Sequence, residues 1–402
     1  MKISFKKAGT IIISAAALTV CVILLSAFPA QKPSPVQRSQ SSAESSVAGE
    51  FSISSTSDKS GGFMSAVWVP FMSLDLSGTD RSEAAARKRL EDIFDRVKQA
   101  GADTVFLHVH PFCDALYKSS LFPSSHLLSG KQGQEPGYDF LKIAAELAKK
   151  RSLHIHAWVN PLRVTYSKTP SALSADNPYN KWKNDNNSAN DRWCFKSSGN
   201  IYLNPAYPEV RRLITDGIRE IVRNYDIDGV VIDDYFYPDG DFDADKTEYE
   251  LYTSSAGDTY LSQSNWRKQN INSLVSSFYS AVHYEKPGCV FGISPQCNME
   301  NDERLAADIR SWCSISGYCD YISPQTYVSM AHPVLPFEKS VREWKKLVTN
   351  KSIRLYISLA LYKEGTDADS GTWQEDEIRK QISYCKKAGT DGYVLFSSEN
   401  LK

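Results

Sequence analysis

Short apolar runs alternate with longer amphipathic stretches along most of this 402-residue chain. The apolar runs are rich in β-branched and aromatic residues, which is typical of buried strands, and the stretches between them have helical periodicity. Strands are expected at residues 63–69, 103–110, 153–160, 229–232, 289–294, 320–327, 354–362 and 391–397. Helices are expected at about residues 81–100, 138–150, 208–224, 262–284, 303–311, 336–348 and 374–388.

This alternation of strands and helices predicts a parallel sheet with right-handed crossovers. Eight strands with helices between them, in roughly 340 residues, fit a (β/α)8 TIM barrel with enlarged loops. The loops after helices are short and those after strands are long, which favours an active site at the C-terminal ends of the strands. An open doubly wound sheet is the alternative, but no glycine-rich phosphate motif follows the first strand. Only five residues follow Ser397, so no eighth outer helix is expected.

The N-terminal sixty residues do not follow this pattern. Lys2, Lys6 and Lys7 precede an uncharged run at residues 8–28, as in a secretory signal or an uncleaved membrane anchor. Residues 1–30 are therefore expected to be a signal peptide or anchor, and residues 31–60, rich in Ser, Pro and Gln, a flexible linker. The barrel is expected to occupy residues 61–402. The protein is thus expected to be exported, and either secreted or anchored at the cell surface.

Charge and composition narrow the function classes. The formal net charge is -1, so no basic excess is available for nucleic-acid phosphates. The 21 tyrosines and 8 tryptophans fit contact with carbohydrate. No zinc-type cysteine spacing occurs, and no cofactor or metal is expected. Export permits disulfides, and Cys313 and Cys319 are close enough to pair, but the sequence leaves their connectivity open.

Polar and aromatic residues gather at the predicted ends of the strands. The most informative stretch is DIDGVVIDDYFYP, residues 226–238, in which an apolar run ends in Asp233, Asp234 and Tyr235. Carboxylates and amides hydrogen-bond sugar hydroxyls and aromatic rings stack on sugar faces, so such a set suits a polyhydroxylated ligand. The residues expected to position a sugar are His110, Asn160, Arg163, Tyr235, Gln325 and Tyr327.

Asp234 or Asp233 is the candidate catalytic carboxylate. Adjacent strand residues face opposite sides, so one is expected to point into the barrel mouth and the other to support a loop or the helix layer. Glycosidic cleavage needs two carboxyl groups set apart across the bond. The second must then come from another loop, and the candidates are Asp114, Glu135, Asp139, Glu300, Asp302, Glu303 and Glu399.

Two other function classes stay open. The pairs His108/His110 and His154/His156 raise a metal-dependent amidohydrolase or deacetylase, because alternate strand residues share a face and each pair could hold one ion. The fifth and sixth strands carry no histidine, and His154 is better explained as a core residue. A non-catalytic glycan-binding protein is the other alternative, because the sequence does not place the second carboxylate.

Several motifs together resemble the glycosyl-hydrolase-like family 10, whose members are exported bacterial (β/α)8 proteins. The resemblance covers about residues 61–402 and implies cleavage of glycosidic bonds. Characterised relatives suggest cell-wall polysaccharide as the substrate, in particular peptidoglycan glycan strands stripped of peptide stems. The motifs are FMSAVWV, HVHPFCDALY, HAWVNPLR, YLNPAYPEVR, DIDGVVIDDYFYP, GISP and DYISPQTY.

The resemblance also carries residues over position by position. Family positions are matched by Asp114, Tyr117, Asp139, Asn160, Arg163, Asp233, Asp234, Tyr235 and Tyr237. The chain departs from the family pattern at His110, where relatives tend to have Arg, at Gln296 and at Val328. These three positions lie at the expected mouth, so they bear on substrate detail more than on the fold.

Overall fold

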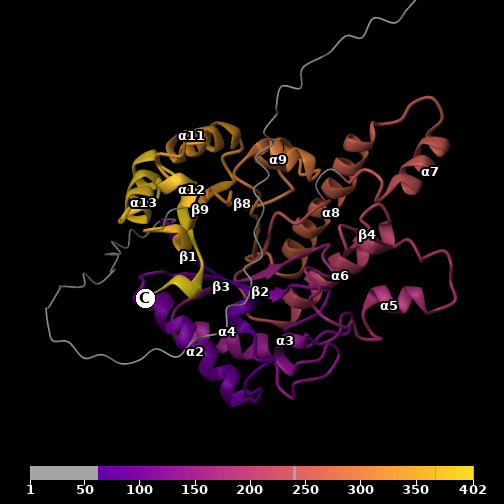
Figure 1. Ribbon diagram of the computed structural model, residues 1–402, viewed down its shortest axis with the longest axis horizontal. Coiled ribbons are helices and arrows are strands. Elements are labelled where there is room, and N and C mark those ends of the chain that lie inside the picture. Colours follow the sequence, from indigo (N-terminus) through magenta and orange to yellow (C-terminus); the bar gives the residue numbers. More distant parts are fainter. Residues whose placement is uncertain (1–61, 239–240, 367, 402) are drawn as a thin grey trace, which may run out of the picture. The chain divides into compact units, whose positions relative to one another are not determined.

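The computed structural model describes residues 62–238, 241–366 and 368–401. Eight parallel strands close into a barrel in the order β1-β10-β9-β8-β7-β6-β3-β2, which confirms the predicted (β/α)8 fold (Figure 1). The expected leader at residues 1–30 and linker at residues 31–60 lie outside the described residues. The barrel strands are β1 (Met64–Val69), β2 (Thr104–His110), β3 (His154–Val159), β6 (Gly229–Ile232), β7 (Val290–Ile293), β8 (Tyr321–Ile322), β9 (Arg354–Ala360) and β10 (Gly392–Phe396).

The predicted helices surround this barrel. Figure 1 shows α2 and α4 on one side and α11 and α13 on the opposite side. Apolar residues spaced along one face of each helix pack on the strands, as Leu90, Phe94 and Val97 do in α2. The long helices are α2 (Glu83–Gln99), α4 (Phe140–Lys150), α6 (Pro208–Asn224), α8 (Gln263–Glu285), α11 (Phe337–Leu347) and α13 (Glu377–Ala388).

Two expected elements are shorter than predicted. In place of one helix at residues 303–311, the chain forms α9 (Met299–Arg304) and α10 (Ile309–Ser314). Ala306 between them has a positive φ of 62°, which no α-helix accommodates. The strand expected at residues 320–327 ends at Ile322, shortly before Pro324, whose nitrogen has no hydrogen to donate to a ladder.

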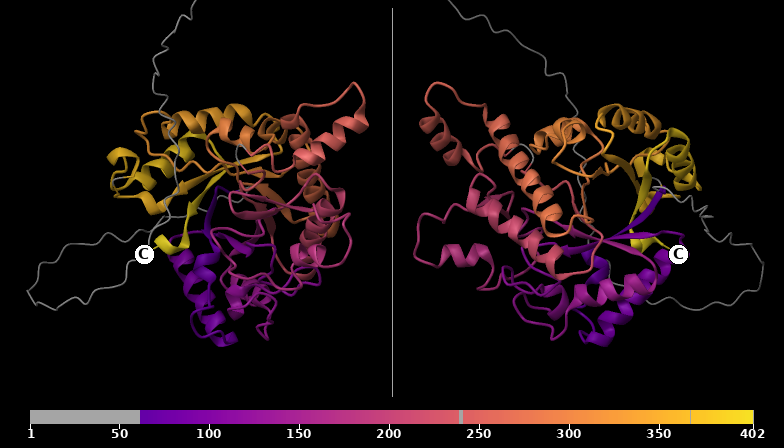
Figure 2. Two further views of the ribbon diagram at one scale, coloured as in Figure 1. Left: turned by 45° about the vertical axis from the view of Figure 1, so that its right-hand side comes forward. Right: turned by 180° about the vertical axis from the view of Figure 1, so that it is seen from behind.

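The long loops after the strands contain further short elements. Figure 2 shows α7, in the loop after β6, projecting beyond α8. The loop after β3 folds into an antiparallel hairpin of β4 and β5. These elements are α1 (Phe71–Leu74), α3 (His126–Ser129), α5 (Pro178–Lys183), β4 (Cys194–Ser197), β5 (Asn200–Leu203), α7 (Lys246–Ala256), η1 (Leu361–Lys363), α12 (Ala368–Gly371) and η2 (Ser398–Asn400).

Aromatic rings fill the interior of the barrel. Trp68, Phe106, Trp158, Tyr321 and Tyr356 form one buried cluster inside the strands. Two glycines make room for rings of this layer. A Cβ at Gly292 would overlap the ring of Tyr321, and one at Gly229 would come within 2.7 Å of the ring of His156. These glycines interrupt otherwise β-branched runs because the neighbouring strand needs space for a ring.

The seam beside β1 is covered by the short turn η2. This turn follows β10 and packs against β1 and α2 (Figure 1). Ser398 Oγ lies 3.2 Å from Ser73 Oγ of α1, within hydrogen-bond distance. The segment after β10 therefore takes the place where an eighth helix would otherwise cover the barrel.

The prediction that His154 is a core residue is wrong. His154 is a surface residue, with 64% of its side chain exposed, and its Nδ1 lies 3.1 Å from Asp228 Oδ1. It is the first residue of β3, and its side chain is exposed to solvent. Cys313 and Cys319, considered as a disulfide, are both buried free thiols.

No helix in the described part of the chain has the length and apolar character needed to cross a membrane.

Candidate active site

Asp233 forms the floor of a polar site at the C-terminal mouth of the barrel. Its Oδ2 accepts a hydrogen bond from Trp158 Nε1 at 2.9 Å, and Asn160 Nδ2 donates to Oδ1 at 3.1 Å. The backbone N–H of Tyr235 donates to Oδ1 at 3.4 Å. With only 2% of its surface exposed, Asp233 is closed in by these donors. Its role in the geometry is to join the end of β3 to the turn that follows β6.

Asp234 stands beside this floor and is partly exposed. Gln325 Nε2 donates to its Oδ1 at 2.8 Å and to the carbonyl of Ser294 at 3.1 Å. Gln325 is in turn held by its backbone N–H, which donates to the carbonyl of Pro295 at 2.9 Å. The carboxyl group that a ligand can reach is therefore oriented by an amide from the loop after β8.

The two aspartates differ in what they contact, as expected, but strand alternation is not the reason. Asp233 contacts β3 residues and Asp234 contacts the loop after β8, yet both lie at the mouth. The alternation fails because β6 ends at Ile232, before either aspartate. The Asp233 side chain then bonds the N–H two residues ahead, as in an Asx turn, and this turns the chain out of the strand.

Arg163 ties the floor to the aromatic side of the mouth. Its backbone N–H donates to Asn160 Oδ1 at 3.1 Å, and its Nε donates to the carbonyl of Pro111 at 3.1 Å. The guanidinium carbon lies 4.5 Å from the ring centroid of Tyr235 and 5.6 Å from that of Tyr166. This buried cation fixes the Tyr235 ring and places positive charge near the aspartates.

Tyr327 and Tyr362 form the opposite, partly open side. Their ring centroids are 6.3 Å apart in an edge-on arrangement, and Tyr327 also lies 5.6 Å from Phe396. Burial raises the pKa of Tyr327. The charges of Tyr362 and of the nearby carboxyl groups of Asp234 and Asp233 raise it further. An amide, a carboxyl group and aromatic rings thus converge on one opening, as a sugar site requires.

Burial and mutual repulsion alter the acidity of the aspartates. Burial and the charge of Asp234 raise the pKa of Asp233 to about 7, although Arg163 and the Trp158 donor oppose this. Burial likewise raises the pKa of Asp234, opposed by hydrogen bonds from Gln325 and Gln296. Two adjacent carboxyl groups in such a site cannot both ionise without cost, so the pair retains a proton well above the usual range for aspartate.

Five of the predicted site residues lie away from this opening. His110 is buried against Phe122, with ring centroids 4.5 Å apart, and burial lowers its pKa to about 4. Its Nδ1 is 3.5 Å from the Tyr117 hydroxyl. Asp114 is also buried and accepts a hydrogen bond from Gln132 Nε2 at 3.1 Å. These three residues brace the loop after β2.

The other two serve helices. Asp139 caps α4 by accepting from the N–H of Lys142 at 3.2 Å, and the Tyr225 hydroxyl donates to it at 3.0 Å. Tyr237 is buried in the core, where the Arg267 guanidinium carbon lies 4.6 Å from its ring centroid. The structure thus brings together Asp233, Asp234, Asn160, Arg163, Tyr235, Gln325 and Tyr327.

The histidines of the proposed metal pairs do not share surroundings. The strand register shifts between His108 and His110 in β2. His108 stacks on Trp158, with ring centroids 3.6 Å apart, whereas His110 lies against Phe122. His156 is buried, with Nδ1 2.8 Å from the Tyr321 hydroxyl, whereas His154 is exposed. Among the described residues, no three His, Cys, Asp or Glu side chains are grouped to hold a metal.

Comparison with known proteins identifies the family of the chain. A model of the family described as glycosyl hydrolase-like 10 matches residues 64–374. The chain belongs to this family. It is 32% identical over 360 residues to glycosyl hydrolase YngK of Bacillus subtilis strain 168, a match covering 84% of this chain and 68% of YngK. It is also 32% identical to glycosyl hydrolase DigH of Escherichia coli K12, covering 83% of this chain and 80% of DigH.

Membership of the glycosyl hydrolase-like 10 family makes the chain a glycosidase with a carbohydrate substrate. Solved structures agree on the fold. The glycoside hydrolase domain of PgaB (BpsB) from Bordetella bronchiseptica superposes with a TM-score of 0.55 at 16% identity, covering 83% of this chain and 94% of that domain. Alpha-L-fucosidase isoenzyme 2 from Paenibacillus thiaminolyticus superposes with a TM-score of 0.52 at 10% identity. That match covers 85% of this chain and 47% of the fucosidase chain.

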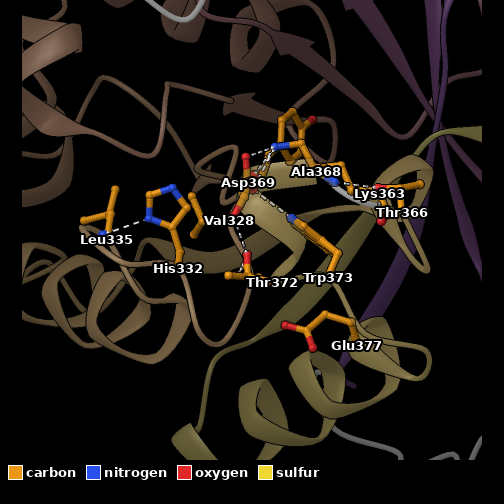
Figure 3. Close-up of polar contacts among 12 residues, drawn as sticks. Val328, His332, Leu335, Lys363, Thr366, Ala368, Asp369, Thr372, Trp373 and Glu377 are labelled. Carbon is orange, nitrogen blue, oxygen red and sulfur yellow. Dashed lines mark hydrogen bonds and ion pairs between the residues drawn. The ribbon is translucent and has the colours of Figure 1, made fainter. Parts of the chain in front are cut away.

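In this family member, residues of the loop after β9 support the backbone of Tyr327. Lys363 Nζ donates to the carbonyl of Tyr327 at 2.9 Å and pairs with Asp369 Oδ2 at 3.1 Å. Figure 3 shows Asp369 between Lys363 and Trp373, whose indole Nε1 donates to Asp369 Oδ2 at 2.7 Å. Gln381 Nε2 adds a bond to the carbonyl of Val328 at 3.0 Å. These contacts fix the backbone that carries Tyr327.

The sequence did not single out this support or the role of Gln296. Gln296 was noted only as a departure from the family pattern, yet it hydrogen-bonds Asp234. Its own backbone N–H donates to Asp302 Oδ1 at 2.9 Å. The one signal in the sequence was the position of Gln296 directly after the strand-ending GISP. Lys363 and Asp369 carried no signal, because Lys363 bonds Tyr327 from a loop 36 residues further along the chain.

Proposed function

We propose that this glycosidase hydrolyses the glycan strands of peptidoglycan, with Asp234 as the acid that protonates the leaving oxygen. The observation that carries the proposal is the partly exposed Asp234, held by Gln325 at 2.8 Å beside a closed Asp233. General acid catalysis needs a carboxyl group that keeps its proton near neutral pH, and burial raises the pKa of Asp234 in that direction. Asp233 lies too deep to touch the sugar and supports the turn.

The aromatic and amide groups around Asp234 suit a chain of sugars. Tyr235, Tyr327 and Tyr362 offer ring faces or edges at the opening, and Gln296 and Gln325 offer amides. Sugar rings stack on such faces while their hydroxyls bond the amides. The family resemblance points to peptidoglycan strands, and an exported protein, as the uncharged run at residues 8–28 predicts, would meet them outside the cytoplasm.

Incubation of the purified protein with peptidoglycan glycans, followed by mass spectrometry, tests this function. Two substrates are compared, strands with peptide stems and strands from which an amidase has removed them. We expect shorter saccharides that have gained one water per cut, formed faster from the denuded strands. Strands that stay intact while bound to the protein would instead support a glycan-binding role and overturn the proposal.

The proposed location has a separate test. Cells that produce the full chain are fractionated, and the protein is detected in the cytoplasm, membranes and medium. We expect it in membranes or medium, and protease added to intact cells lacking an outer barrier should digest it. Recovery in the cytoplasmic fraction would contradict export, without bearing on the chemistry of the site.

A further inference from the structure

Only one carboxyl group of the aspartate pair is open to a ligand. The oxygens of Asp233 accept from Trp158, Asn160 and the Tyr235 backbone, and Asp233 is 2% exposed. Asp234 is partly exposed. Hydrolysis requires a nucleophile or base as well as an acid, so the other group must be sought elsewhere.

Among the partner acids suggested by the sequence, Asp302 interacts with the charge of Asp234 but cannot reach a sugar. Burial is the main cause of the raised pKa of Asp302, and the charge of Asp234 raises it further. Asp302 nevertheless has 0% exposure and lies behind Gln296, whose backbone N–H donates to it at 2.9 Å. It acts on the site through Gln296 and does not face the opening.

Several other candidates are engaged away from the mouth. Asp114 is buried under the loop after β2, and Asp139 caps α4. Glu303 pairs with Lys268 of α8. Glu399 belongs to η2, which packs beside α2. The printed partners of Asp114, Asp139 and Glu303 thus hold these three carboxyl groups away from Asp234, and Glu399 lies on the turn that covers the seam of the barrel.

The remaining two candidates, Glu135 and Glu300, are exposed. Glu300 lies two residues before Asp302 on α9, so at about 100° per residue it points to the opposite face of the helix. Glu135 is exposed in the loop between α3 and α4.

The tyrosines of the mouth are poor substitutes for a carboxylate nucleophile. Burial, followed by the charge of Asp234, raises the pKa of Tyr235, and burial raises that of Tyr327 well above its usual value. Both phenols therefore stay protonated at neutral pH, and a neutral phenol attacks an anomeric carbon slowly. The site thus offers an acid, whereas neither the partner acids suggested by the sequence nor these tyrosines supply a matching nucleophile.

We propose that the glycan supplies its own nucleophile, the carbonyl oxygen of the 2-acetamido group on the sugar being cleaved. This rests on the proposed function, since both sugars of peptidoglycan carry that group. The acetamido oxygen forms a bond to C1 while the C1–O glycosidic bond breaks, and the leaving oxygen takes the proton of Asp234. Water then adds to C1 of the cyclic oxazolinium intermediate and gives a proton back to the Asp234 carboxylate.

This mechanism fits what the site provides. A single acid on one side of the sugar is sufficient, because it acts first as acid and then as base. The products keep the anomeric configuration of the substrate, because C1 is displaced twice. The substrate class is narrowed to glycans with N-acetylated amino sugars at the cleaved position.

The test compares strands that differ only in the acyl group. Denuded strands are de-N-acetylated and then re-acylated with acetyl or with trifluoroacetyl groups, so that the second has a much weaker carbonyl nucleophile. We expect kcat on trifluoroacetylated strands to fall by about a hundredfold with little change in KM. NMR of the first products should show retained anomeric configuration, and a sugar thiazoline that mimics the oxazolinium should inhibit competitively.

Equal kcat for both acylated strands, or products of inverted configuration, would overturn the inference while leaving hydrolysis intact. The re-acetylated strands are the matched control, since they have passed through the same chemistry. If these strands are not cut either, the proposed function itself fails and the inference with it. The two failures are therefore distinguishable.

Discussion

The indole Nε1 of Trp158 donates a hydrogen bond to Asp233 Oδ2 at 2.9 Å, and both groups are buried. Trp158 stands near the end of β3 and Asp233 directly after β6, the next strand around the barrel. The bond stabilises the charged form of Asp233 and so limits how far burial raises its pKa. It also couples the acidity of the aspartate pair to the aromatic layer inside the barrel.

Replacing Trp158 by Phe removes this donor, so the apparent pKa of the pair should rise. We expect an increase of about one unit, seen as a shift of the carboxyl resonances in NMR titration and of the alkaline limb of the activity profile. Trp344→Phe is the matched control, because its indole donates to the carbonyl of Cys297, at 3.1 Å, on another side of the fold. An unchanged titration in Trp158→Phe would contradict the assigned role of the bond.

The raised pKa of Asp233 predicts how stability depends on pH. The folded chain binds a proton at this site up to about pH 7, whereas an unfolded aspartate loses it near 3.8. Between these values the folded state holds more protons, so stability falls as pH rises, by about 4 kcal/mol at most. Asp233→Asn should flatten the fall in unfolding free energy between pH 4 and 7, measured by denaturant titration.

The surface variant Asp92→Asn provides the comparison for that experiment, because its side chain is 54% exposed on α2. It should keep the wild-type dependence on pH. If Asp233→Asn also keeps it, Asp233 is not the group that carries a raised pKa in the folded protein.

The barrel could be predicted from the sequence because each strand and helix has its own periodicity. The runs at residues 229–232 and 354–362 needed no information from elsewhere in the chain, and the structure places strands there at Gly229–Ile232 and Arg354–Ala360. Asp233, Asp234, Gln325 and Tyr327 were found for a related reason, since strand ends in a parallel barrel meet at one face.

What could not be predicted depends on contacts between distant segments. The orientation of Asp234 follows from the end of β6 at Ile232 and from the bonds that Trp158 and Asn160 make with Asp233. The exposure of His154 depends on its place at the first residue of β3. Such features are set by tertiary packing, which strand periodicity does not report.

The support behind Tyr327 predicts a functional effect at a residue outside the opening. Lys363→Met removes the bond to the Tyr327 carbonyl and leaves Asp369 with the indole of Trp373 as a donor. We expect unfolding free energy to fall by about 1–2 kcal/mol and kcat/KM to fall about tenfold, through a higher KM. Lys351→Met, in the exposed turn before β9, should change neither quantity.

Measurement well below the melting temperature separates the two effects of Lys363→Met. If the loss of kcat/KM persists there, it reflects displacement of Tyr327 from its place in the site. A variant that is destabilised but keeps the wild-type KM would show that Lys363 has only a structural role.

Gln325 orients the proposed acid, so its removal should change both rate and pH dependence. Gln325→Leu takes away the donor to Asp234 Oδ1 that lowers the pKa of this carboxyl group. The alkaline limb of the activity profile should move to higher pH, while kcat falls about tenfold because the carboxyl group is less well placed. A lower kcat with an unmoved limb would mean that Gln325 contacts substrate without setting the acidity of Asp234.

The most direct measurement is the rate at which Asp234→Asn cuts denuded glycan strands, with product detection by mass spectrometry. An amide cannot protonate the leaving oxygen, so we predict a loss of about 10²–10⁴ in kcat with an unchanged melting temperature. Glu300→Gln and Glu399→Gln, which replace exposed carboxyl groups outside the opening, should keep wild-type rates. Wild-type activity in Asp234→Asn, or its loss in either glutamate variant, would contradict the assignment of the acid to Asp234.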